Sequence, residues 1–223
     1  MAAGLFGQTV PDSVLNKKPV SPDKVKRSDV LLIGFNSDRL LGLKKPVKQK
    51  WYGRGMDVSL MFDHPLVDGG RFSIAGGIGF ATHNYYTNAF AVKIDSINKS
   101  TFVPEPDSSI RDKGKISVNY FDIPFELRYR SKPNTKGYSW KLFLGGRVGY
   151  LLDAHEKYFN AEGRKFKSYY YPHVSLFRYG VSARVGYGSV MLSAFYSISP
   201  FFEAPFALNR YNTLTIGLTI VPF

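Results

Sequence analysis

Apolar and polar residues alternate with a period of two along most of this chain, from about residue 29 to the end. Successive side chains of a β-strand point to opposite faces, so this period predicts strands with one apolar face. The alternation recurs in about eight segments, near residues 29–40, 54–66, 72–86, 117–131, 139–155, 175–187, 190–201 and 211–223. Within 117–131, Pro124 lacks a backbone donor and predicts a bulge or a weakly paired position. The pattern predicts an all-β, antiparallel fold.

The connections between these segments alternate in length. They are long at residues 41–53, 87–116 and 156–174, short at 67–71, 132–138 and 188–189, and intermediate at 202–210. Outer-membrane barrels have tight turns on the periplasmic side and longer loops outside. The lengths therefore predict an eight-stranded up-and-down transmembrane barrel over residues 29–223.

The composition supports this fold and excludes several kinds of site. The chain has 223 residues with 16% aromatic content, 21 Gly and no Cys. It contains no apolar run of the roughly 20 residues that a membrane-spanning helix needs. Without cysteine there is no thiolate ligand or nucleophile, and the histidines do not form a metal-binding spacing. We therefore predict no metal and no cofactor.

The residues on the polar face indicate which face is the interior. They are mostly Gly, Ser, Ala and Thr with single charges, whereas a water-exposed face would carry dense Lys and Glu. Such small residues suit the narrow, polar-filled lumen of an eight-stranded barrel. The alternative, a soluble lipocalin-like carrier, would place the apolar face inside. Charges in the lumen are expected to neutralise one another. The expected lumen charge network is Asp57, Asp63, Asp122, Glu126, Arg128, Arg130, Lys141, Arg147, Arg178 and Arg184.

Aromatic residues gather near the ends of the expected strands and predict two girdles at the membrane interfaces. The girdle toward the long loops would comprise Trp51, Tyr52, Tyr85, Tyr86, Tyr150, Tyr158 and Phe201. The girdle toward the short turns would comprise Phe72, Tyr129, Trp140, Tyr187 and Phe223.

The segment FDIPFELRYR, Phe121 to Arg130, resembles the fourth-strand signature of small outer-membrane barrels from Bacteroidota, the PorT-like or OmpX-like group. Trp51 to Leu66 and Phe72 to Asn88 resemble the second and third strands of that group. The resemblance implies a bacterial outer-membrane location. Some members serve the type IX secretion and gliding machinery, and others have no assigned role. Phe223 departs from the usual pattern, because it is out of phase with Leu214 to Ile220.

The first 28 residues precede the alternating pattern and differ from it in composition. Residues 1–8 resemble the end of a secretory signal, and residues 9–28 are polar, proline-containing and basic. We expect residues 1–28 to form an N-terminal periplasmic tail.

The expected function is that of a structural or interaction barrel, an accessory subunit of a larger secretion or assembly complex in the envelope, and not an enzyme. The alternative is an outer-membrane enzyme that modifies lipid A, with His83 as candidate base. The net charge of +13 indicates either solvated loops or an anionic partner. Lipid and lipopolysaccharide are expected partners, along with other envelope proteins, and nucleic acid is not. The expected lipopolysaccharide contacts are Lys44, Lys45, Lys48, Lys50, Arg164, Lys165 and Lys167.

Overall fold

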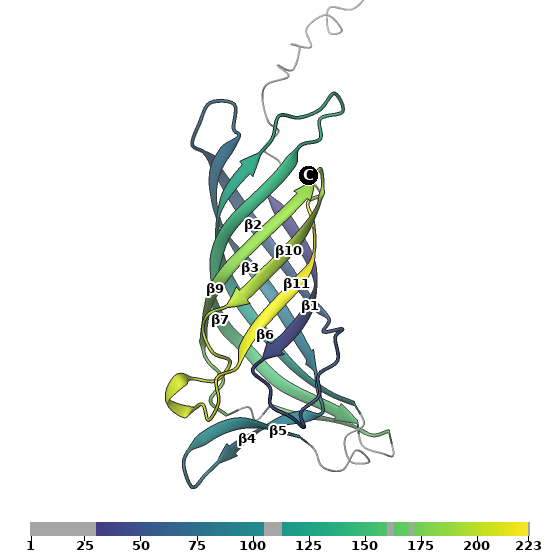
Figure 1. Ribbon diagram of the computed structural model, residues 1–223, viewed down its shortest axis with the longest axis vertical. Coiled ribbons are helices and arrows are strands. Elements are labelled where there is room, and N and C mark those ends of the chain that lie inside the picture. Colours follow the sequence, from purple (N-terminus) through teal and green to yellow (C-terminus); the bar gives the residue numbers. More distant parts are fainter. Residues whose placement is uncertain (1–29, 105–112, 160–162, 170–171, 223) are drawn as a thin grey trace, which may run out of the picture.

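A computed structural model describes residues 30–104, 113–159, 163–169 and 172–222 of the chain. The expected periplasmic tail and Phe223 lie outside these ranges. Of the strands in the described residues, eight close into an antiparallel barrel (Figure 1). They are β1 (Leu31–Leu41), β2 (Gly55–Pro65), β3 (Phe72–Tyr86), β6 (Lys113–Arg130), β7 (Trp140–Phe159), β9 (Phe177–Tyr187), β10 (Val190–Ser197) and β11 (Asn212–Ile220). The predicted fold is confirmed, with strand bounds close to those expected.

The barrel closes because every spanning strand pairs with two neighbours. The sheet runs β6-β3-β2-β1-β11-β10-β9-β7, and β6 also pairs with β7. The first and last strands of the barrel meet in register, with Phe35 opposite Leu218. Closure leaves no unpaired sheet edge within the membrane, where an unpaired backbone group would be costly.

The two ends of the barrel differ in the length and structure of the connections between strands. Short turns join β2 to β3, β6 to β7 and β9 to β10 at one end, the upper end in Figure 1. The other end carries three further strands, β4 (Ala89–Ile94), β5 (Lys99–Pro104) and β8 (Lys165–Ser168), and the short 3-10 turn η1 (Ala204–Phe206). The long connections at 87–116 and 156–174 were expected to be loops. In the structure they contain the β4-β5 hairpin and β8, which adds to the edge of β7. The elaborated end is extracellular by the turn-length rule.

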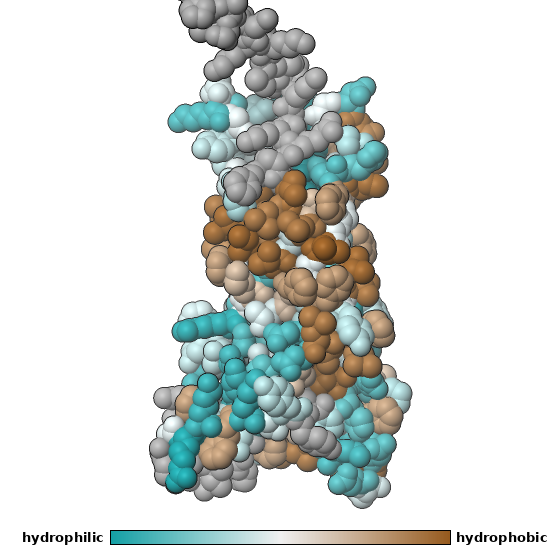
Figure 2. Space-filling model, turned by 180° about the vertical axis from the view of Figure 1, so that it is seen from behind, coloured by the Kyte–Doolittle hydropathy of each residue, from teal (hydrophilic) through white to brown (hydrophobic). Residues whose placement is uncertain are grey.

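Large apolar side chains cover the outside of the barrel. Phe62 is 70% exposed, Phe80 59% and Leu144 50%. On the face drawn in Figure 2, brown apolar side chains form a band between more polar ends. The described residues include no helix long and apolar enough to cross a membrane. An apolar exterior is suited to lipid, so the alternative of a soluble carrier is wrong.

The girdle on the turn side is confirmed for its four members within the described residues. The rings of Phe72 and Tyr129 lie 5.0 Å apart, and those of Trp140 and Tyr187 lie 5.4 Å apart, all on the outer face. The girdle on the loop side is only partly correct. Tyr85 and Phe201 are buried inside the extracellular mouth instead of facing lipid.

Pro124 predicted a bulge or a weakly paired position, but the irregularity of β6 lies at another place in the strand. Pro124 pairs in register with Arg147, and the register shift lies between Asn119 and Tyr120. The shift changes which residues of β7 face outward beyond it. Asp153, expected on the lumen side, is paired with Asn119 and shares the outer face with it.

Candidate functional site

The middle of the barrel is filled by buried charged side chains. The carboxylates are Asp38, Asp57, Asp63, Asp122 and Glu126, and the guanidinium groups are Arg128, Arg130, Arg147, Arg178 and Arg184. The two sets are equal in number, so their charges balance. An unpaired charge in such a place would be strongly destabilising.

The extracellular half of this network centres on Asp122. Arg178 Nη2 donates to both carboxylate oxygens of Asp122, at 2.7 and 3.0 Å, and Arg147 Nη1 donates to one of them at 3.2 Å. Gly149 lies between Asp122 and Arg178 in the register of the sheet. A Cβ atom at Gly149 would lie 2.9 Å from Nε of Arg178, so only glycine leaves room for this pair.

The periplasmic half centres on Glu126 and Asp63. Glu126 accepts hydrogen bonds from Arg128 Nε at 2.9 Å and forms an ion pair with Arg184. Asp63 forms an ion pair with Arg130 at 3.0 Å. The guanidinium carbons of Arg128 and Arg130 also lie 4.6 and 5.2 Å from the ring centroid of Phe143, close enough for cation–π attraction. Lys141 is half-buried at the turn end, opposite Arg130 in the register.

His83 is inside the barrel and is not an accessible base. Its side chain is 1% exposed, and both ring nitrogens are engaged. Arg178 Nη1 lies 2.7 Å from Nε2 and has only donors, so Nε2 must accept. The ring proton is therefore on Nδ1, which donates to Asp38 at 2.6 Å. Asp38 was absent from the expected network, although its alternation places it on the lumen face.

Apolar clusters close both ends of the charged lumen. At the extracellular end, Phe102 of β5 packs against Phe201 and Phe202 of the β10–β11 connection, with ring centroids 5.5 and 4.9 Å apart. We call this cluster, which also contains Tyr85 and Tyr211, the aromatic cap. The cluster of Leu32, Met61, Ala75, Phe143, Met191 and Val221 lies toward the turns. Arg178 packs against Tyr120 of the first cluster and Arg128 against Phe143 of the second, so apolar side chains adjoin the ion pairs toward both ends of the lumen.

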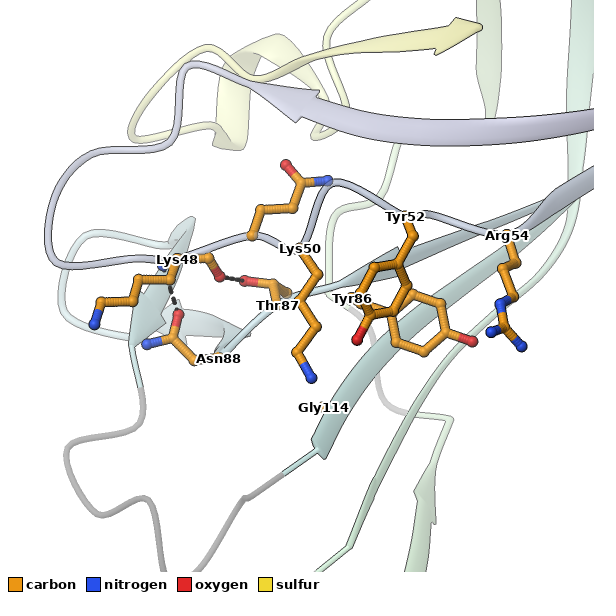
Figure 3. Close-up of a pocket in the computed structure, with 9 residues that line it drawn as sticks. Lys48, Lys50, Tyr52, Arg54, Tyr86, Thr87, Asn88 and Gly114 are labelled. Atoms are coloured by element: carbon orange, nitrogen blue, oxygen red, sulfur yellow. Dashed lines mark hydrogen bonds between the residues drawn. The ribbon is translucent and has the colours of Figure 1, made fainter. Parts of the chain in front are cut away.

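A basic groove of about 470 Å³ lies outside the barrel at the extracellular end (Figure 3). The first long connection crosses the end of β3, since Lys50 N donates to Tyr86 O at 2.9 Å and Lys48 N donates to Asn88 Oδ1 at 2.7 Å. Figure 3 shows Lys50, Tyr52 and Arg54 extending toward the same side as Tyr86. Gly114 completes the lining, where a Cβ atom would lie 2.6 Å from the carbonyl oxygen of Thr87.

The expected lipopolysaccharide contacts divide into two groups. Lys48 and Lys50 line the groove, whereas Lys44 and Lys45 are exposed in the same connection without lining it. Arg164 precedes β8, and Lys165 and Lys167 lie in it.

Two lysines that were not expected to belong to the site connect these groups. Lys115 of β6 is the register partner of Tyr86 on one side and of Lys157 on the other, and Lys157 is the partner of Lys167. Partial burial, together with the positive charges of Lys157 and Lys165, lowers the pKa of Lys115 below that of an ordinary lysine. Lys50, Lys115, Lys157 and Lys167 therefore form one row across the extension, which we call the lysine row.

A carboxylate, an imidazole and a hydroxyl lie between the lysine row and the apolar band. Asp153 Oδ2 is 2.5 Å from Nδ1 of His155, and Ser117 is the register partner of His155. Burial lowers the pKa of His155, and the neighbouring Asp153 acts against this shift. The Ser117 hydroxyl donates to Asn84 Oδ1 at 2.9 Å and does not bond the imidazole. These residues have the composition of a hydrolytic triad but not its hydrogen bonding.

Comparison with known proteins identifies the class. The family model for an outer membrane protein beta-barrel domain matches residues 26–211. The chain belongs to this family and is an outer-membrane barrel. No curated protein matches the sequence.

Two solved structures of one protein match this chain. The crystal structure of Ail, the attachment invasion locus protein of Yersinia pestis, is 12% identical with a TM-score of 0.34, over 85% of this chain and 95% of Ail. The structure of Ail in complex with the heparin analogue sucrose octasulfate is 14% identical with a TM-score of 0.31, over the same shares of the two chains.

Proposed function

We propose that this chain is a non-enzymatic, non-conducting interaction barrel and an accessory subunit of a larger envelope complex. The observation that carries the proposal is the filling of the lumen. Balanced buried ion pairs occupy its middle, and the aromatic cap and the cluster toward the turns occupy its ends. A sealed barrel is a rigid support. The part of it that can contact a partner is therefore its extracellular surface.

The extracellular surface is suited to an anionic partner. Lys44, Lys45, Lys48, Lys50, Arg164, Lys165 and Lys167 are the proposed contacts for lipopolysaccharide, because cations form strong, charge-assisted hydrogen bonds with phosphate. The resemblance of Phe121 to Arg130 to the PorT-like group supports a place among the Bacteroidota barrels and a role beside a secretion or assembly machinery.

Two measurements test this function. Recordings in planar bilayers should show no stable channel, and purification from native membranes in mild detergent should recover the barrel with other envelope proteins. A reproducible single-channel conductance would contradict the sealed lumen. A barrel that always elutes alone after crosslinking in the intact envelope would contradict the subunit role.

A second candidate function is the hydrolysis of acyl esters of lipid A. The observation that favours it is the Asp153–His155 pair with Ser117 as cross-strand neighbour, at the outer margin of the apolar band. It requires the Ser117 hydroxyl to leave Asn84 and donate to His155. Mass spectrometry of lipid A from cells with the wild-type protein and with Ser117→Ala tests it, and identical acylation would exclude it.

A further inference from the structure

We propose that the lysine row and the adjoining groove bind the phosphorylated saccharide head group of an outer-leaflet glycolipid. The proposal rests on the interaction function proposed above and deepens it, because it places the phosphorylated part of the glycolipid at one defined site. It also assigns a role to Lys115 and Lys157.

The lysine row has an arrangement that is unfavourable without a ligand. Lys115, Lys157 and Lys167 are direct cross-strand partners on one face of the β6-β7-β8 sheet. Like charges directly opposite one another destabilise a sheet. Adjacent strands are about 4.8 Å apart, so Lys115 and Lys167 are separated by about 10 Å at the backbone. One polyanion with several phosphate groups spans that distance.

Within the described ranges, none of these three lysines forms an ion pair with a carboxylate. Lys115 lies over the ring of Tyr86, with Nζ 5.9 Å from its centroid, and Lys167 lies over the ring of Tyr169 at 4.1 Å. The nearest acid on the same face, Asp153, is held by His155 and by Asn119. The positive charge of the row is therefore not neutralised by the neighbouring strands.

The groove extends the row with surfaces that suit a sugar. Tyr86 is shared, since it lines the groove and pairs with Lys115. Tyr52 and Tyr86 pack with ring centroids 5.8 Å apart, and Lys50 Nζ lies 5.8 Å from the Tyr52 centroid. Tyrosine offers an apolar ring face with a polar hydroxyl, and Lys48, Lys50 and Arg54 add three cations.

The position of the row relative to the membrane favours a lipid-linked ligand over a free one. Phe121 and Phe80 end the apolar band on β6 and β3, with ring centroids 5.3 Å apart. Lys115 lies six residues before Phe121 on the same face of β6, toward the extracellular end. This corresponds to about 14 Å along the membrane normal at about 3.3 Å per residue and about 45° of tilt. Lysine stems can reach back toward the interface. A glycolipid with acyl chains on the band would place its phosphorylated sugars at this height.

Native mass spectrometry of the detergent-solubilised full chain tests the proposal directly. The probes are purified short-chain lipopolysaccharide and the same material after dephosphorylation with hydrofluoric acid. The test variant carries Lys115→Gln, Lys157→Gln and Lys167→Gln, and the control carries Lys132→Gln and Lys136→Gln in the short turn between β6 and β7, at the opposite end of the barrel. Lys115 and Lys157 are half-buried and Lys167 is exposed, so the folding of both variants is compared with wild type by heat-modifiable gel mobility.

The proposal predicts that the triple variant binds intact lipopolysaccharide about tenfold more weakly than wild type, from the loss of about three exposed ionic contacts. The control should stay within about twofold. Dephosphorylation should weaken binding to wild type as much as the triple substitution does. Equal binding of the dephosphorylated probe, or an unaffected triple variant, would overturn the proposal.

Inorganic phosphate and heparin serve as competitors that distinguish the source of the anion. The proposal predicts that neither displaces lipopolysaccharide at equal phosphate or sulfate concentration. Displacement by heparin at that concentration would show a soluble polyanion site and overturn the lipid assignment. Displacement by phosphate would show that the saccharide and lipid contribute nothing. The sealed lumen and the recovery of partner proteins do not depend on these lysines, so a failure here is distinguishable from a failure of the proposed function.

Discussion

Arg178 reaches across Gly149 to hold both carboxylate oxygens of Asp122, at 2.7 and 3.0 Å, in the interior of the barrel. The same guanidinium donates to His83 and lies 3.9 Å from the ring centroid of Tyr120. One side chain thus joins β9 to β6 and β3 through the lumen.

Replacing Arg178 should therefore cost much of the stability of the barrel. We expect Arg178→Met to lower the free energy of unfolding by about 3–5 kcal/mol, because it leaves Asp122 buried with fewer partners. Urea titration of the folded barrel in detergent micelles measures the change. The control is Arg39→Met on the exposed face of β1, which should change stability by less than about 0.5 kcal/mol. Equal losses from both variants would contradict a special role for the ion pair.

Gly149→Ala should damage the same contact without removing any of its charges. The new Cβ atom would meet Nε of Arg178 at 2.9 Å and would also contact the carboxylate of Asp122. We expect a loss of about 1–3 kcal/mol from the resulting overpacking. At Gly76 a Cβ atom meets nothing within 4 Å, so Gly76→Ala should be neutral or slightly stabilising. A loss at Gly76 as large as at Gly149 would indicate a general effect of alanine in the strands.

The aromatic cap should contribute to stability as a packed core does. Phe202 is fully buried among Phe102, Phe201 and Tyr211, and we expect Phe202→Ala to cost about 3–5 kcal/mol. Phe166→Ala, at a half-exposed ring in β8, should cost less than about 1.5 kcal/mol. Urea titration compares the two variants, and similar costs would show that the cap is not a packed core.

Removing one charge from the lysine row should stabilise the folded barrel. Removing Lys115 relieves its repulsion with Lys157, so Lys115→Met should raise the free energy of unfolding by about 0.5 kcal/mol without ligand. Because the pKa of Lys115 is lowered by folding, the unfolded chain binds more protons between the folded pKa and the unfolded value of about 10.4. Stability due to this residue should therefore rise with pH in that window. Lys115→Met should remove that rise, and urea titrations at several alkaline pH values measure it. A loss of stability in the variant would mean that Lys115 has a structural role.

The barrel and the direction of its faces follow from the sequence because alternation reports directly on the two faces of a strand. Leu60, Ile123 and Leu144 face outward as expected, and Asp57, Asp122 and Arg147 face inward. The three small strands were missed for a physical reason. β4 and β5 have six residues each and β8 has four, too few for the period to stand out from a polar loop.

The site could be predicted only in part, since it depends on register. Lys115 lies far from Lys157 and Lys167 in the sequence and meets them only through strand pairing. The irregularity between Asn119 and Tyr120 moves the outward positions of β7 by one residue beyond it. Alternation does not reveal such a shift, and so the outward position of Asp153 was not expected.

Spin labels at single cysteines test most directly whether the apolar face meets lipid while the lysine row lies above the membrane. The chain contains no cysteine, so Leu144→Cys and Lys157→Cys each give one labelled site. In lipid vesicles, the label at position 144 should relax strongly with oxygen and weakly with a water-soluble nickel complex, and the label at position 157 should show the reverse. A label at position 144 that the nickel complex reaches as readily as the label at position 157 would contradict the lipid-embedded barrel.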